Sequence, residues 1–141
     1  MRARYPLSED DGCIAVARHR ALAFLEQAEA KHQVPVSSRA RGSVQLVVSE
    51  LVTNAIKYAP GPVLMELRLT ARAVDIVVWD SAPSVPAPQA ADPGRIGQHG
   101  LEIVKAITDE LFTEQATVGK RIIARLCLSD ADGAAAAQSA V

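Results

Sequence analysis

The sequence predicts an α+β domain in which a mostly antiparallel sheet is covered on one face by helices. The periodic segments run in the order strand, two helices, hairpin, long loop, helix, hairpin, without the regular βαβ alternation of a parallel sheet. In addition, 141 residues with an apolar fraction of 49% are enough for one domain with its own hydrophobic core.

The N-terminal half supplies a short strand and two helices. Weak alternation over residues 2–7 predicts an edge strand, which a polar turn follows. Apolar residues at mixed helical spacing predict a helix over about 13–31. Ser37 or Ser38 then caps a second helix, which continues to about Tyr58.

The C-terminal half supplies two hairpins separated by a long loop and a helix. Alternating residues predict strands over 63–70 and 74–80, joined by a short connector. A proline-rich loop follows, and apolar spacing predicts a third helix that begins near Gln98. Two final strands, over 111–117 and 121–128, meet at a turn.

Composition limits the function and the location of the protein. The formal net charge is −1 and the basic residues are scattered, so the chain lacks the basic stripe of a protein that binds nucleic acid directly. Neither a membrane-spanning apolar run nor a signal peptide is recognisable, so we expect a cytoplasmic protein. The domain is expected over residues 1–128. Residues 129–141 are Ala-rich, lack large apolar side chains and are expected to form a disordered tail.

The strongest local feature is a polar stripe on the second predicted helix. At about 100° per residue, Glu50 and Asn54 lie about 40° apart, and Lys57 lies about 20° from Glu50 on the other side. A carboxylate and a carboxamide one turn apart offer hard oxygen ligands for Mg²⁺ that bridges phosphates. The carboxylate can alternatively take a proton from a hydroxyl nucleophile. Taken alone, the stripe also fits the solvated side of an amphipathic helix.

Two weaker features lie downstream. Gly97 and Gly100 flank His99 where the long loop meets the third helix, and exposed N–H groups at a helix start bind anions. The same glycines also fit a structural turn. Asp80 ends an apolar strand, where its carboxylate can accept a hydrogen bond from an exocyclic amine such as that of adenine, or from its own backbone.

In combination and in this order, these motifs resemble those of the GHKL ATPase superfamily. The matching motifs are Glu50-Leu51-x-x-Asn54-Ala55 on a helix, Asp80 at a strand end, and Gly97-x-His99-Gly100-Leu101 on a helix. Within the superfamily the chain resembles the stand-alone anti-sigma factor serine/threonine kinases of actinobacteria, over about residues 2–128. The resemblance implies a two-layer sandwich of the Bergerat ATP-binding type.

The resemblance also implies a role for each site residue. Glu50 occupies the position of the general base and Asn54 that of the Mg²⁺ ligand. Asp80 matches the aspartate that reads the adenine amino group, and the loop over 81–96 is expected to cover ATP. The other residues expected to bind the nucleotide are Lys57, Gly97, His99, Gly100 and Leu101.

The chain departs from the family pattern at the adenine end of this expected site. Ala82 stands where a glycine or serine is usual, two places after the aspartate. Arg121 is interpreted as taking the place of a threonine that helps to hold adenine.

The implied function is an ATP- and Mg²⁺-dependent kinase. It would transfer the γ-phosphate to a serine of an anti-sigma-factor antagonist and would also sequester a sigma factor. One alternative is a non-catalytic or ATP-modulated module that only binds its partner. Another is an ATP hydrolase or a sensor-kinase domain that phosphorylates histidine. The relatives often form homodimers through the sheet or the first-helix surface, and the sequence leaves open whether this chain does.

Overall fold

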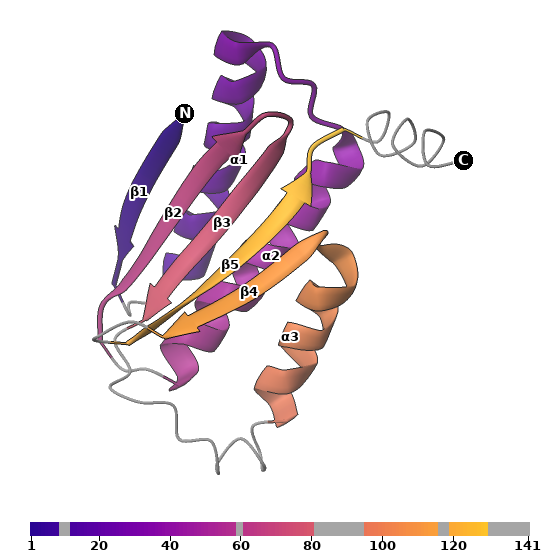
Figure 1. The fold of residues 1–141 in the computed structure, drawn as a ribbon. Helices are drawn as coiled ribbons and strands as arrows, with labels where there is room; N and C mark the ends of the chain where they lie inside the picture. The colour runs from indigo at the N-terminus through magenta and orange to yellow at the C-terminus, as the bar shows by residue number, and fades with distance from the viewer. Residues whose placement is uncertain (9–11, 59–60, 81–94, 116–118, 130–141) are drawn as a thin grey trace.

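The computed structural model describes residues 1–8, 12–58, 61–80, 95–115 and 119–129. These residues form a five-stranded antiparallel sheet in the order β1-β2-β3-β5-β4, with three helices on one of its faces (Figure 1). The strands are β1 (Arg2–Leu7), β2 (Val63–Thr70), β3 (Ala73–Asp80), β4 (Glu110–Gln115) and β5 (Lys120–Cys127), and the helices are α1 (Cys13–His32), α2 (Ser38–Tyr58) and α3 (Arg95–Ile107). The predicted α+β two-layer class is confirmed.

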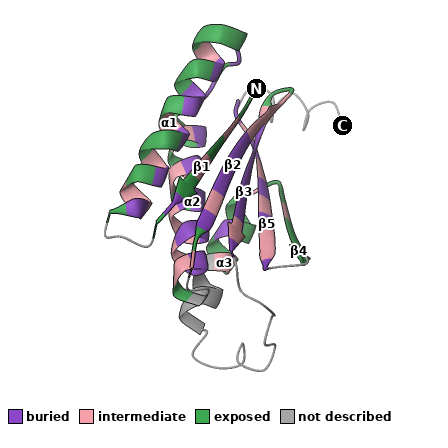
Figure 2. Cartoon of the chain, turned by 90° about the vertical axis from the view of Figure 1, so that its left-hand side faces the viewer, coloured by how far each residue is buried: buried purple, intermediate pink, exposed green. Residues whose placement is uncertain are grey.

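The first two helices pack against each other and against the sheet. Small residues allow α1 to approach α2 closely, since Ala17, Ala21 and Ala28 are all fully buried. Ser37 is the cap of α2, because its Oγ accepts a hydrogen bond from the Ala40 N–H at 3.0 Å. Of the two predicted capping serines, the structure therefore selects Ser37. Figure 2 shows the layers from the side, with buried positions of α1 turned toward the strands.

The core lies between the helices and one face of the sheet. Met65, Leu67 and Ile76 alternate with residues of the other face and are fully buried against the helical layer. On α2, Val47 and Val48 are fully buried as well. Both described hairpins are antiparallel, as predicted, and Gly119 turns into β5 with a φ of 80°.

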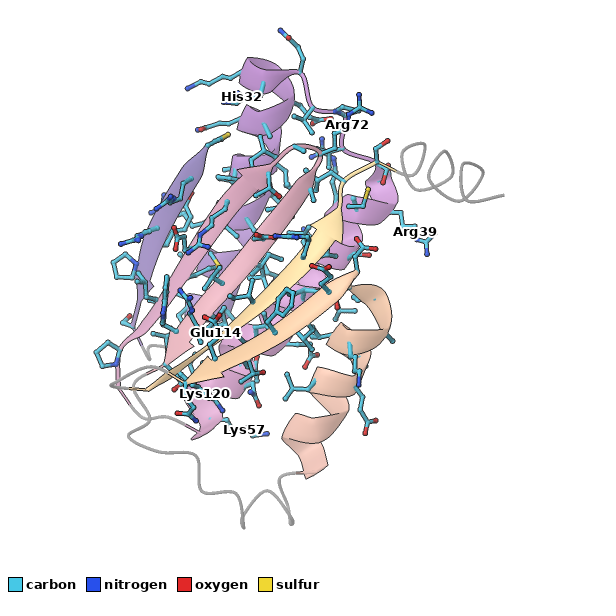
Figure 3. All side chains as sticks on the ribbon, viewed as in Figure 1. His32, Arg39, Lys57, Arg72, Glu114 and Lys120 are labelled. Carbon is cyan, nitrogen blue, oxygen red and sulfur yellow. The ribbon has the colours of Figure 1, made fainter. Side chains whose placement is uncertain are left out.

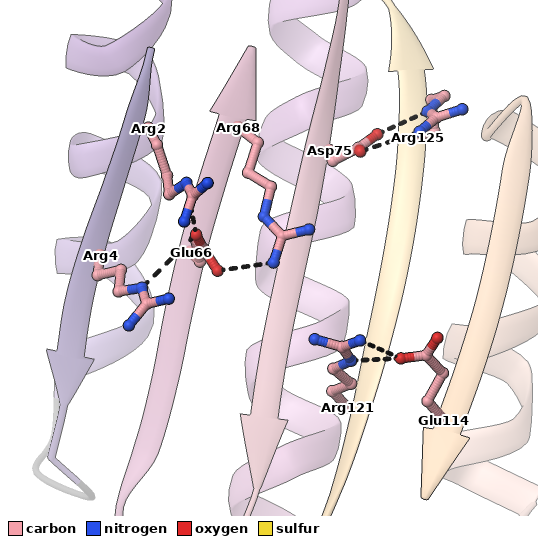
Figure 4. Close-up of polar contacts among 8 residues, drawn as sticks. All are labelled: Arg2, Arg4, Glu66, Arg68, Asp75, Glu114, Arg121 and Arg125. Carbon is pink, nitrogen blue, oxygen red and sulfur yellow. Dashed lines mark hydrogen bonds and ion pairs between the residues drawn. The ribbon is translucent and has the colours of Figure 1, made fainter. Parts of the chain in front are cut away.

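The opposite face of the sheet, called the open face below, is not covered by any described helix (Figure 1). It consists of the even-numbered residues of β1, β2 and β4 and the odd-numbered residues of β3 and β5. On it, Glu66 is fully buried although it is charged. Three arginines surround its carboxylate: Arg2 at 3.3 Å, Arg4 at 3.5 Å and Arg68 at 3.0 Å (Figure 4).

This arginine cluster decides the protonation of Glu66. Burial by itself raises the pKa of the carboxyl group, but the hydrogen bond from Arg68 and the charges of Arg68, Arg4 and Arg2 outweigh burial, so the pKa is lowered below its ordinary value of 4.5. The same hydrogen bond raises the pKa of Arg68. Glu66 is therefore a buried, ionised carboxylate in ion-pair contact with three arginines, although within the described residues its Oε2 accepts no hydrogen bond.

The other half of the open face is held by further ion pairs. Arg125 binds both carboxylate oxygens of Asp75, at 2.7 and 3.1 Å, and also contacts Glu110 on the edge strand at 3.2 Å. Arg121 pairs with Glu114, and its guanidinium lies 5.7 Å from the centre of the Trp79 ring. These contacts tie β3, β5 and β4 together (Figure 4).

The remaining differences from the predicted elements lie at their ends. Helix α3 begins at Arg95, earlier than the predicted start near Gln98. Its first turn includes Gly97 in spite of the low helix propensity of glycine. Strand β4 is described only to Gln115. Of the predicted tail, all but Ser129 lies outside the described residues. None of the described helices combines the length and the apolarity needed to cross a membrane.

Candidate nucleotide-binding site

Helix α2 holds Glu50 and Asn54 at the border between its buried and solvent-facing sides. Leu51 and Ala55, each next to one of them, are buried in the core. Asn54 is itself buried, with 8% of its surface exposed, whereas Glu50 is half-buried and Lys57 is exposed. At a spacing of four residues, the side chains of Glu50 and Asn54 are neighbours, about 5–6 Å apart at Cβ. A purely solvated stripe would not bury Asn54.

Neither side chain has a hydrogen bond or an ion pair within the described part of the chain. The amide atoms of Asn54 are not among the described polar atoms that are both enclosed and unpartnered, so they are open to a water, an ion or a ligand. The pair therefore has the character of a binding site, in contrast to the paired carboxylates of the open face.

Asp80 is the last residue of β3 and lies on the face that carries the helices. Val74, Ile76 and Val78 alternate on this face and are buried in the core, and Asp80 continues the row with 7% of its surface exposed. Helix α2 packs against both β3 and α3. Its C-terminal end, the end of β3 and the start of α3 all lie at the lower end of the domain in Figure 1.

The glycines of the third motif lie inside a helix. Since α3 begins at Arg95, Gly97 is in the first turn, where backbone N–H groups have no intrahelical partner, whereas Gly100 is one turn further in. Leu101 packs against the core. The side chain of His99 lies outside what the structure describes. Of the predicted cover over 81–96, residues 81–94 also lie outside it, and Arg95 and Ile96 belong to α3.

The structure corrects the interpretation that Arg121 lies in the adenine pocket. Arg121 belongs to the open face, where Glu114 and Trp79 hold it, so it points away from Asp80. The residue directly opposite Asp80 is Lys120. The alternation of Ile122, Ala124 and Leu126 in β5 could have indicated this face from the sequence. These even-numbered residues are buried, and Lys120 therefore lies on the helix-bearing face with them.

Comparison with known proteins identifies the family. Residues 14–126 match the family of the histidine kinase-like ATPase domain. The chain belongs to this family. No curated protein shows significant similarity to it.

Two solved structures with similarity to the chain are histidine kinases. One is the histidine kinase domain of the blue-light activated histidine kinase of Erythrobacter litoralis EL346, with 17% identity, a TM-score of 0.49, and coverage of 82% of this chain and 61% of that chain. Another is the histidine kinase AdeS of Acinetobacter baumannii, with 13% identity, a TM-score of 0.49, and coverage of 91% and 68%. Family membership rests on the match over residues 14–126, not on these scores.

A histidine kinase-like ATPase domain binds ATP, usually with Mg²⁺, and this chain accordingly has the architecture of an ATP-binding regulatory domain. The described residues contain no group of three or more His, Cys, Asp or Glu that could hold a metal by themselves. A magnesium ion bound together with ATP does not need such a group. Mg²⁺ commonly takes one or two protein oxygens and completes its shell with phosphate oxygens and water, and the unpaired Asn54 carboxamide is a donor of that kind.

Proposed function

We propose that the chain is an ATP-dependent serine/threonine kinase of the anti-sigma factor type. It transfers the γ-phosphate of ATP to a serine of an anti-sigma-factor antagonist, and it sequesters a sigma factor through the same domain. The observation that carries the proposal is the pair formed by Glu50 and the buried Asn54, one helical turn apart and both without a hydrogen bond or ion pair within the described residues.

In the proposed reaction, Asn54 would supply one ligand of Mg²⁺, and the bound ion would neutralise charge on the phosphates. The acceptor serine oxygen attacks the γ-phosphorus, and the bond from this phosphorus to the bridging β-γ oxygen breaks. ADP leaves with the electron pair of that bond. Glu50 accepts the proton of the serine hydroxyl. Lys57, Gly97 and His99 belong to the phosphate side of the proposed site, and Asp80 to the adenine side.

Mg-ATP should raise the melting temperature of the wild-type protein. A ligand at about 100 times its Kd adds about 2.7 kcal/mol of stability, which corresponds to roughly 5–10 °C for a domain of this size. Asn54→Ala should remove most of this shift. Differential scanning fluorimetry with and without Mg-ATP measures both.

Gln45→Ala is the matched control, because Gln45 is half-buried on the opposite side of α2. Its shift with Mg-ATP should equal that of the wild type. A wild-type protein that shows no shift contradicts the kinase proposal. A wild-type shift without any transfer to a serine would instead favour the non-catalytic partner-binding module.

A homodimer also belongs to the proposal, and the open face is the surface that we assign to it. Phe112 is exposed there to 45%. The β1 half of the face carries three arginines around one glutamate, and β4 at the other edge carries Glu110 and Glu114. A two-fold axis parallel to β3 would place the arginine-rich half of one copy over the acidic edge of the other, so the face is complementary to a second copy of itself.

Phe112→Glu should convert the proposed dimer to a monomer, because it replaces the exposed apolar side chain of the contact by a charge. Leu46→Glu is the control, since Leu46 is similarly exposed, at 40%, but lies on α2. Sedimentation equilibrium of the wild type and both variants measures the result. A monomeric wild type, or equal dissociation by both substitutions, contradicts the assignment of the open face.

A further inference from the structure

Lys120 occupies a defined place beside Asp80. The two residues are direct partners in the register of β3 and β5. Directly opposed residues of antiparallel strands have Cβ atoms about 4.5–5.5 Å apart and project from the same face. That face is the one that carries the helices, because Val78 and Ile122, the pair two positions along the same strands, are both buried in the core.

Within the described residues, the Lys120 ammonium group has no hydrogen bond and no ion pair. The next residue, Arg121, contrasts with it, since Glu114 and Trp79 engage its guanidinium on the open face. Lys120 is half-buried and lies at the same end of the domain as Lys57 (Figure 3).

We propose that Lys120 is a second base-reading residue, which donates a hydrogen bond to the ring nitrogen beside the adenine amino group while Asp80 accepts one from that amino group. The inference rests on the proposed binding of ATP. It goes further, because it assigns the preference for adenine to two residues: Asp80, which accepts a hydrogen bond, and Lys120, which donates one.

The chemistry of the pair selects adenine. An ionised aspartate only accepts hydrogen bonds, and a lysine ammonium only donates them. Adenine presents an amino donor flanked by ring-nitrogen acceptors, which matches this order. Guanine presents O6, an acceptor, where adenine has its amino group, so a guanine in the same orientation faces the Asp80 carboxylate with a second acceptor. Two acceptors that face each other cannot form a hydrogen bond, so guanine in this orientation is disfavoured.

Isothermal titration with Mg-ATP tests the proposal on wild type, Lys120→Met and Arg121→Met. Methionine keeps the length of the side chain and removes the donor. Lys120→Met should weaken binding about 10- to 100-fold, as expected for the loss of a charge-assisted hydrogen bond. Arg121→Met, the adjacent residue on the opposite face, should change binding by less than about threefold. Melting temperatures without nucleotide verify that both variants fold.

Two analogues separate base reading from simple attraction to the phosphates. One of the two analogues, 1-deaza-ATP or 7-deaza-ATP, lacks the ring nitrogen that Lys120 contacts. The wild type should bind that analogue as weakly as Lys120→Met binds ATP. Lys120→Met should bind that analogue no more weakly than the wild type does. Equal loss on substitution for ATP and both analogues overturns the proposal, as does unchanged ATP binding by Lys120→Met. A wild-type chain that does not bind Mg-ATP overturns the proposed function itself, and this inference with it.

Discussion

Replacement of Glu50 by glutamine should reduce phosphoryl transfer to the acceptor serine by about 10²- to 10⁴-fold, the usual contribution of a general base. Glutamine keeps the size and the polarity of the side chain but cannot accept the serine proton. Binding of Mg-ATP should stay nearly unchanged, because the proposed metal ligand is Asn54 and Glu50 acts only on the attacking hydroxyl. The effect is therefore expected in the rate of transfer and not in the affinity for nucleotide.

The measurement uses γ-labelled ATP and a purified anti-sigma-factor antagonist, with the same antagonist lacking its acceptor serine as the blank. Glu26→Gln is the matched control, since Glu26 is an exposed glutamate of α1. It should transfer phosphate at the wild-type rate. If Glu50→Gln abolishes Mg-ATP binding, Glu50 holds the nucleotide and is not the base. If transfer continues at the wild-type rate, the proposed role of Glu50 is wrong.

The sequence was sufficient for those parts of the fold that local signals decide. The strand over residues 2–7 and the serine cap of α2 follow from alternation and from capping chemistry within a few residues. The Glu50 and Asn54 stripe was predictable for the same reason, because both residues lie on one helix whose period fixes their relative direction. The start of α3 was less predictable, since glycine disfavours a helix and this helix nevertheless begins at Arg95, before Gly97.

Features that depend on pairing between distant segments were not predictable in the same way. Alternation places Glu66 on the polar side of its strand, which suggests an exposed residue. It is buried because Arg2 and Arg4, on a strand some sixty residues earlier in the chain, lie over it. Arg121 was likewise assigned to the nucleotide site, because it was taken to stand where the family has a threonine. Its true face follows from the register of β5 with β3.

Replacement of Glu66 by alanine should destabilise the folded protein by about 3 kcal/mol at pH 7, the lower end of the cost of breaking a buried ion pair. The carboxylate is fully buried and neutralises part of a cluster of three arginines. Without it, Arg68 retains a buried Nε that has no hydrogen-bond partner in the described structure. Arg2 and Arg4 are exposed to 60% and 56% and can turn to solvent, which keeps the cost at the lower end.

Urea unfolding followed by the fluorescence of Trp79, the single tryptophan of the chain, measures this loss. Glu114→Ala is the control, because Glu114 also pairs with an arginine on the open face but is exposed to 47%. An exposed pair of this kind should contribute less than about 1 kcal/mol. If the two substitutions cost the same, burial of the Glu66 carboxylate is not what gives its ion pairs their weight.

The pH dependence provides an independent test of the charge on Glu66. Because its pKa is lowered in the folded state, the unfolded chain binds the proton more readily, and the stability that Glu66 contributes is present above its ordinary pKa of 4.5. It is lost as the pH falls through the lower pKa of the folded state. Glu66→Gln removes this titration but keeps the shape of the side chain. The difference in unfolding free energy between wild type and Glu66→Gln should therefore be constant from pH 7 to about pH 5.5 and shrink below about pH 4.5. A difference that grows on acidification would mean that the arginines do not hold Glu66 in its ionised form.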